Sequence, residues 1–210
     1  MTSPNRSEIA VLLDRSGSMA SVKDDVEGGF ARFLESQRQI PGECALSLTQ
    51  FDSEAIEEVY VACPIAVAPG LTLHPRGMTP LLDAVGRTIG RTGERLAAQA
   101  EPHRPGRVLF VIITDGMENA SREFSRAQVR ELIDRQRTVY RWEFIYLGAN
   151  VDAFAEAGGL GIAGSHAAAF HASPAGIHQA FAVTSRKCAD FRAGRSPAFT
   201  GADREELEQD

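Results

Sequence analysis

One short segment of the chain carries oxygen-bearing side chains at three alternate positions. Asp14, Ser16 and Ser18 follow directly after the apolar run 9–13. Because alternate residues of an extended segment point the same way, these side chains can converge on one point, and Gly17 lets the backbone bend. All three donors are hard oxygens, with no thiolate or imidazole among them, which suits Mg2+, and also Mn2+ or Ca2+, better than zinc. The segment therefore predicts part of a site for a divalent cation.

Two other segments offer the donors that would complete such a site. Thr79 precedes a predicted helix, with Thr79 as its N-cap and Pro80 as its first residue, where the missing N–H costs nothing. Asp115 closely follows a second apolar run, 108–113. Runs that are apolar on both faces indicate central strands of a parallel sheet, in which ligands gather at the carboxyl ends of the strands. We therefore expect Asp14 and Asp115 at the same edge of one sheet.

The order of these segments, Asp-x-Ser-x-Ser, a distant Thr and a distant Thr-Asp-Gly, resembles the von Willebrand factor type A domain with its metal-ion-dependent adhesion site. The likeness extends over about residues 8–160. It implies that Ser16 and Ser18 bind the metal directly and that Thr79 joins them in a high-affinity state. Asp14 and Asp115 would then act through water. The Thr79 hydroxyl has a competing role, since it could cap its helix when no metal is bound.

The pattern of elements predicts an α/β fold. We expect a Rossmann-like three-layer sandwich, with a mostly parallel central sheet, one antiparallel edge strand and helices on both faces. Strands 44–51 and 55–61 would form the antiparallel edge as a hairpin. The predicted organisation is an N-terminal lead at 1–7, the α/β domain at 8–192, and a flexible acidic tail at 193–210.

Composition narrows the class of protein. The chain has 210 residues, of which 43% are hydrophobic and 24% charged, as expected for one globular domain. A net charge of −6 without a dense basic stripe argues against nucleic acid as a principal partner. The sequence shows neither a signal-peptide core nor an apolar stretch of membrane-spanning length, so no membrane partner is expected. Three scattered cysteines and a strong preference for Arg over Lys indicate a cytoplasmic, bacterial protein with reduced thiols.

The chemistry of the predicted site favours binding over catalysis. Neutral hydroxyl ligands leave most of the charge of a cation uncompensated, and an open coordination position must be filled by water or by a visiting group. A carboxylate would gain a charge-assisted bond there. The expected partner is another protein that presents an Asp or Glu to the metal. The resemblance also implies an accessory role in a cytoplasmic multiprotein system, alongside an ATPase or a stress-response component.

Two other functions remain open at this point. Strands that end in Asp and in Thr-Asp-Gly also occur in metal-dependent phosphotransferases and phosphatases of the haloacid dehalogenase-like family, with Asp14 as the nucleophile. That family carries a second acid two residues later, where this chain has Ser16, so the usual general acid/base is missing. The sequence offers no convincing Ser-His-Asp or Cys-His arrangement, and we expect no enzyme activity. The other alternative is a structural domain that a metal merely stabilises.

Other polar residues carry weaker signals. Glu118 and Asn119 could line the rim of the metal site, although an ordinary polar loop is the simpler interpretation. The spacing of His166, His171 and His178 fits no zinc pattern, so we expect these side chains to be solvated or structural.

Overall fold

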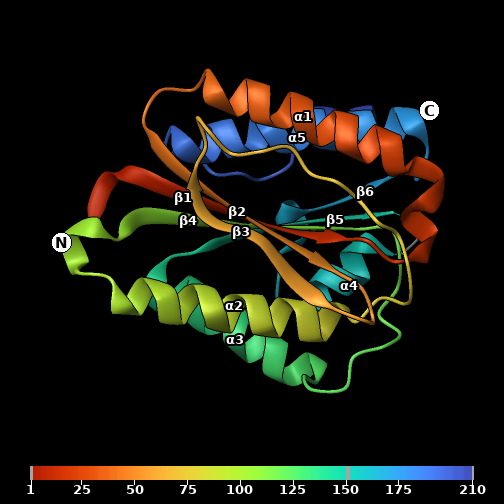
Figure 1. Cartoon of the computed structure of the whole chain (residues 1–210), viewed down its shortest axis with the longest axis horizontal. Helices are drawn as coiled ribbons and strands as arrows, with labels where there is room; N and C mark the ends of the chain where they lie inside the picture. The colour runs from red at the N-terminus through yellow and green to blue at the C-terminus, as the bar shows by residue number, and fades with distance from the viewer. Residues whose placement is uncertain (1, 150–151, 210) are drawn as a thin grey trace.

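A six-stranded sheet forms the middle layer of the part of the chain that the structure describes (Figure 1). The computed structural model describes residues 2–149 and 152–209. The strands lie in the order β3-β2-β1-β4-β5-β6, and every neighbouring pair is parallel except β2 and β3. The strands are β1 Ser3–Asp14, β2 Glu43–Phe51, β3 Ile56–Pro64, β4 Pro105–Thr114, β5 Glu143–Ala149 and β6 Ala167–Phe170. This confirms the predicted mostly parallel sheet with one antiparallel edge strand.

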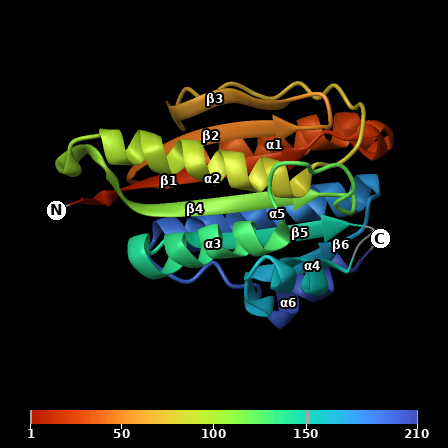
Figure 2. The same ribbon diagram turned by 90° about the horizontal axis from the view of Figure 1, so that it is seen from below.

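Helices cover both faces of the sheet (Figures 1 and 2). The α-helices are α1 Lys23–Arg38, α2 Leu81–Ala98, α3 Arg126–Tyr140, α4 Ala153–Gly159, α5 Pro174–Arg192 and α6 Gly201–Leu207. Helices α1 and α5 lie side by side on one face, and α2 and α3 pair on the other. Within the described ranges, none of these helices is both long and apolar enough to cross a membrane.

The alternation of side chains along the central strands builds one hydrophobic core on each face. In β1, Ile9 and Leu13 pack in the core under α1 and α5, whereas Ala10 and Leu12 pack in the core under α2 and α3. Strand β4 alternates in the same way. Because both faces are buried, the strands read as continuous apolar runs, as expected for a parallel sheet between two helical layers. The two central strands are thereby fixed in register, with Leu13 opposite Ile113.

The ends of the chain differ from their predicted roles as a lead at 1–7 and a flexible tail at 193–210. Strand β1 begins at Ser3, so most of the expected lead belongs to the sheet. At the other end, α6 begins with a capping box, and the side chains of Phe199 and Leu207 are buried in the core. The described part of the expected tail thus packs as a further helix of the same domain.

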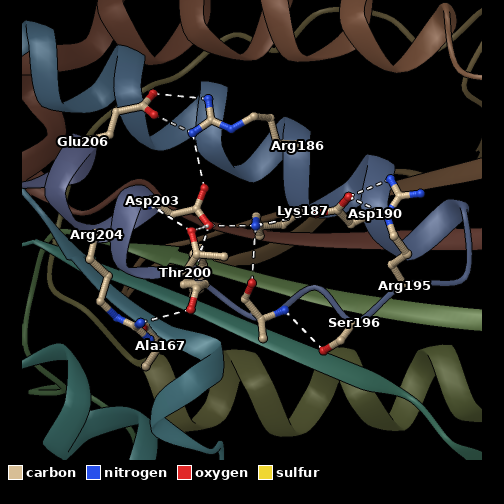
Figure 3. Close-up of polar contacts among 12 residues, drawn as sticks. Ala167, Arg186, Lys187, Asp190, Arg195, Ser196, Thr200, Asp203, Arg204 and Glu206 are labelled. Carbon is tan, nitrogen blue, oxygen red and sulfur yellow. Dashed lines mark hydrogen bonds and ion pairs between the residues drawn. The ribbon is translucent and has the colours of Figure 1, made fainter.

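A buried ion pair also ties α6 to α5 (Figure 3). The Lys187 ammonium lies 2.7 Å from Asp203 Oδ2, and Arg186 reaches the other oxygen of Asp203 at 3.3 Å. Burial alone would raise the pKa of Asp203, but hydrogen bonds from Lys187 and Thr200 outweigh burial, and the net pKa is lowered. One of the acidic residues in the segment predicted as a mobile tail, Asp203, is therefore part of the contact that holds α6 in place.

Candidate metal centre

The first segment of the candidate site begins where β1 ends. Asp14 has no exposed surface, and its two carboxylate oxygens are both engaged. Oδ1 accepts a hydrogen bond from the backbone N–H of Ser16 at 2.7 Å, and Oδ2 accepts one from the Thr114 hydroxyl at 2.6 Å. Since Thr114 ends the neighbouring strand β4, the register of the sheet fixes the orientation of the Asp14 side chain.

The next donors form a chain of short contacts from one strand end to the other. Ser16 Oγ lies 3.1 Å from Ser18 Oγ, and Ser18 Oγ donates to Asp115 Oδ1 at 2.7 Å. Asp115 follows β4 directly and is itself buried. The structure thus brings Asp14, Ser16, Ser18 and Asp115 together at the carboxyl ends of β1 and β4, where the sequence predicted them.

Thr79 reaches the same place from the loop before α2. A Cβ atom built on Gly116 would lie 2.9 Å from Thr79 Oγ1 and 3.8 Å from Asp14 Oδ2. Gly116 therefore faces a small space that Thr79 and Asp14 share, and a side chain at this position would fill it. Hydrogen bonds connect Asp14, Ser16, Ser18 and Asp115, and Thr79 comes near Asp14 beside Gly116. Gly116 is an additional residue whose lack of a side chain leaves room beside Thr79.

The predicted start of this helix, with Thr79 as N-cap and Pro80 as the first helical residue, is wrong by one residue. Helix α2 begins at Leu81 with Pro80 as its N-cap, and no side chain of Pro80 or Thr79 caps it. Glu118 caps the helix instead, because its Oε2 accepts from the backbone N–H of Leu82 at 2.9 Å. At the start of α2 no hydrogen bond from the Thr79 hydroxyl caps the helix, so capping does not occupy this group.

The segment after Asp115 positions Thr79 from the other side. Asn119 Oδ1 accepts from the Thr79 backbone N–H at 2.8 Å, and the Asn119 N–H donates to the Thr79 carbonyl at 3.1 Å. Asn119 and Glu118 therefore hold the metal-site loops and the first turn of α2. The simpler interpretation of these two residues, an ordinary polar loop, misses this role.

The electrostatics of the site are compatible with a bound cation. Burial raises the pKa of Asp14 to about 6, against hydrogen bonds from Thr114 and Ser16 that lower it, and the charge of Asp115 raises it further. Burial also raises the pKa of Asp115. Within the described residues no basic side chain donates to either carboxylate; Arg15, between two of the donors, turns toward Asp52 instead. Two buried carboxylates without a positive partner are costly, and a bound divalent cation would supply the missing charge.

The donor set itself fits a hard cation. Two carboxylates and three hydroxyls all offer oxygen, as Mg2+, Mn2+ and Ca2+ prefer. Across residues 2–149 and 152–209 there is no group of three or more His, Cys, Asp or Glu side chains that could hold a metal, so a cation bound at this edge would need hydroxyl oxygens among its ligands. His166, His171 and His178 do not converge, because they contact Glu143, the Glu208 carbonyl and Asp25, respectively.

Comparisons with known proteins support the fold. No protein-family model matches the chain, and no curated protein matches it. Among solved structures, proximal thread matrix protein 1 from the mussel byssus, with a zinc-occupied MIDAS motif, is similar with a TM-score of 0.62 and 11% identity over 89% of this chain and 46% of that one. A von Willebrand factor type A protein from Catenulispora acidiphila is similar with a TM-score of 0.57 and 14% sequence identity, over 90% of this chain and 43% of that chain. The ArnB paralog VWA2 from Sulfolobus acidocaldarius is similar with a TM-score of 0.54 and 15% sequence identity, over 88% of this chain and 46% of that chain.

Because the sequence identities are low, these structural similarities establish the fold and nothing beyond it. The chain spans less than half of the length of each of the three solved chains. It has the three-layer α/β fold of von Willebrand factor type A domains, and its five oxygen donors stand where the resemblance of the sequence motifs implies a metal site.

Proposed function

From the premise that this chain has the von Willebrand factor type A fold, we propose that it is a metal-dependent protein-interaction module. The observation that carries the proposal is the gathering of five oxygen-bearing side chains at one edge of the sheet, where no basic side chain of the described residues donates to Asp14 or Asp115. Mg2+ is the proposed cation, and Mn2+ or Ca2+ would suit the same donors. The residues that would hold it are Asp14, Ser16, Ser18, Thr79 and Asp115.

The division of charge within the site supports capture of an acidic group. The hydroxyls of Ser16, Ser18 and Thr79 are neutral, and the carboxylate oxygens of Asp14 are already engaged by Ser16 and Thr114. If these hydroxyls bind the cation directly and the carboxylates act through water, the groups in direct contact would leave most of its charge uncompensated, and it would keep an open coordination position. An Asp or Glu side chain of a partner protein would satisfy both with a charge-assisted bond.

The surroundings of the site suggest what accompanies that acidic side chain. Met78 is 51% exposed and precedes Thr79, and Met117 is 64% exposed and lies two residues after Asp115. Large apolar side chains that are exposed beside a polar centre are typical of interaction surfaces, and Met adapts its shape to different partners. We therefore propose a partner segment in which the Asp or Glu has apolar neighbours.

The same geometry argues against phosphoryl transfer by Asp14. A nucleophilic carboxylate needs an oxygen that can reach the phosphorus atom, whereas Asp14 has no exposed surface. The position two residues later, where the phosphotransferases carry their second acid, is Ser16. These two features favour a binding role over phosphoryl transfer. The exposed side chains of Met78 and Met117 support a role beyond mere stabilisation, which would not require apolar side chains exposed beside the site.

The wider setting that we propose rests on sequence composition. The free Cys44, Cys63 and Cys188 and the acidic net charge of −6 suit a bacterial cytoplasmic protein that binds neither nucleic acid nor membrane. In that setting the module would serve a multiprotein system, with an ATPase or a stress-response component as its partner.

A display selection tests the proposed function. A library of random nine-residue peptides would be selected on the immobilised protein in Mg2+ and eluted with EDTA, with Asp115→Ala as the matched negative control. We expect the EDTA eluate from the wild type to be enriched in peptides that contain Asp or Glu beside apolar residues. Changing the acidic residue of a selected peptide to its amide should abolish binding. Enrichment that is equal on Asp115→Ala, or peptides without an acidic residue, would refute carboxylate capture.

A further inference from the structure

The turn between β2 and β3 contacts two of the metal-site segments, although it contributes no donor to the site. Its first residue, Asp52, follows β2 and has a side chain with no exposed surface. The carboxylate accepts hydrogen bonds from two backbone groups of its own turn, the N–H of Glu54 at 2.6 Å and of Ala55 at 2.9 Å. These bonds fix the carboxylate in place, so its remaining contacts reach outward from a rigid anchor.

The first outward contact holds the loop that contains Ser16 and Ser18. Arg15 Nε donates to Asp52 Oδ2 at 2.5 Å, and Arg15 Nη1 lies 2.6 Å from Glu57 Oε2. The Arg15 side chain is only 5% exposed, and its Nη2 has no hydrogen-bond partner within the described residues. A buried guanidinium with an unsatisfied nitrogen depends strongly on the carboxylates that it does contact. Asp52, together with Glu57, therefore holds Arg15 in position.

The second outward contact holds the segment that leads to Thr79. Arg76 Nε lies 3.1 Å from the same Asp52 oxygen, and the Arg76 backbone N–H donates to the Arg15 carbonyl at 3.0 Å. The neighbouring turn residue, Ser53, accepts from the backbone N–H of Met78 at 2.9 Å. Gly77, the residue between Arg76 and Met78, has a φ of +65°, and a Cβ there would lie 2.4 Å from Ser53 Oγ. The contact between these two segments is thus close enough to require glycine.

We propose that Asp52 is a positioning residue of the metal centre, which sets the distance between the Ser16–Ser18 loop and Thr79 without touching the cation. The inference rests on the proposed metal binding. Burial alone would raise the pKa of Asp52, but hydrogen bonds from Arg15, from the backbone of its turn and from Arg76 outweigh burial, and the net pKa is lowered. The carboxylate is therefore ionised, and its contacts with both arginines are charge-assisted. A cation with strict coordination geometry is sensitive to such distances, and loss of a group that orients its ligands typically costs about 10–100-fold in affinity.

The chain offers a matched control at its other end. Asp203 is also a buried carboxylate that holds two basic side chains, Lys187 and Arg186, and it also accepts from the backbone of its own cap (Figure 3). Its contacts join α6 to α5 and involve no residue of the metal site. Asp52→Asn and Asp203→Asn therefore make the same chemical change in similar surroundings, and they differ in whether the anchored groups belong to the metal centre.

The test measures Mn2+ affinity, by the electron paramagnetic resonance signal of free Mn2+, and the free energy of unfolding in EDTA. We expect both variants to lower the unfolding free energy, and only Asp52→Asn to weaken Mn2+ binding, by about 10–100-fold. Arg76→Gln, at a side chain that is 44% exposed, gives a second variant if Asp52→Asn does not fold, and it should weaken binding in the same direction. Wild-type affinity in both Asp52→Asn and Arg76→Gln, or an equal loss in Asp203→Asn, would overturn the inference. A wild-type protein that binds no Mn2+ would overturn the proposed function itself.

Discussion

Gly116→Ala should weaken metal binding while leaving the fold intact. The new Cβ would lie 2.9 Å from Thr79 Oγ1. Since non-bonded heavy atoms prefer a separation of about 3.5–4.0 Å, the Thr79 hydroxyl would have to move by roughly 0.5 Å or more. Binding sites tolerate ligand displacements of only about 0.5 Å, so we expect a loss of about 10–100-fold in Mn2+ affinity, or about 1.4–2.8 kcal/mol.

Stability should change much less than affinity. Gly116 does not have a positive φ, so alanine can adopt its backbone conformation, and the free energy of unfolding in EDTA should stay within about 1 kcal/mol of the wild type. Gly17→Ala is the matched control, because Gly17 lies in the other metal-site loop and a Cβ there would be 3.4 Å from the Gly77 carbonyl oxygen, an ordinary contact. We expect Gly17→Ala to bind Mn2+ nearly as tightly as the wild type.

The Mn2+ affinity and the free energy of unfolding of the two glycine variants would be measured by titrating Mn2+ into EDTA-stripped protein and by urea unfolding of the same samples. Equal Mn2+ affinity in the wild type and Gly116→Ala would show that the space beside Thr79 is not where the cation binds. Equal losses in Gly17→Ala and Gly116→Ala would mean that general loop distortion, and not a blocked space, explains the effect.

Three further outcomes are expected. Thr79→Val should lower Mn2+ affinity about tenfold at nearly unchanged stability, because the lost hydroxyl does not cap α2; unchanged affinity would remove Thr79 from the site. Burial raises the pKa of Asp14 to about 6, so below about pH 6 protons should compete with the cation. The cation affinity measured by calorimetry should then fall about tenfold for each pH unit below about 6. An affinity that stays constant from about pH 7 to 5 would contradict a role for Asp14 in cation binding. Leu207→Ala should reduce the free energy of unfolding in urea by about 2–5 kcal/mol, because its fully buried side chain packs in the core, whereas a mobile tail would give no change.

The parts of the fold that sequence predicted are those that short patterns determine. Continuous apolar runs before Asp14 and before Asp115 indicated buried parallel strands, and the end of each strand indicated where donors would meet. Each of these inferences needs only the period of side chains along a strand. The sheet then brings the two ends together, with Leu13 opposite Ile113.

The parts that sequence did not predict depend on contacts between distant residues. The start of α2 was misplaced because its cap, Glu118, lies 36 residues after Leu82. The contact of Asp52 with Arg15, on which its proposed role rests, was missed for the same reason, since Arg15 lies 37 residues before it. The helix near the end of the chain did have a local signal, the capping box of Thr200 and Asp203, but the polar composition around it concealed that signal.

The most direct test of the central claim is calorimetric titration of Mg2+ and Mn2+ into EDTA-stripped protein, with the wild type beside a Ser16→Ala, Ser18→Ala double variant whose folding is checked by circular dichroism. The proposed site predicts one cation per wild-type chain and loss of that binding in the folded double variant. A wild-type protein that binds no divalent cation, or a double variant that binds it as tightly as the wild type, would contradict the claim that these residues form a metal centre.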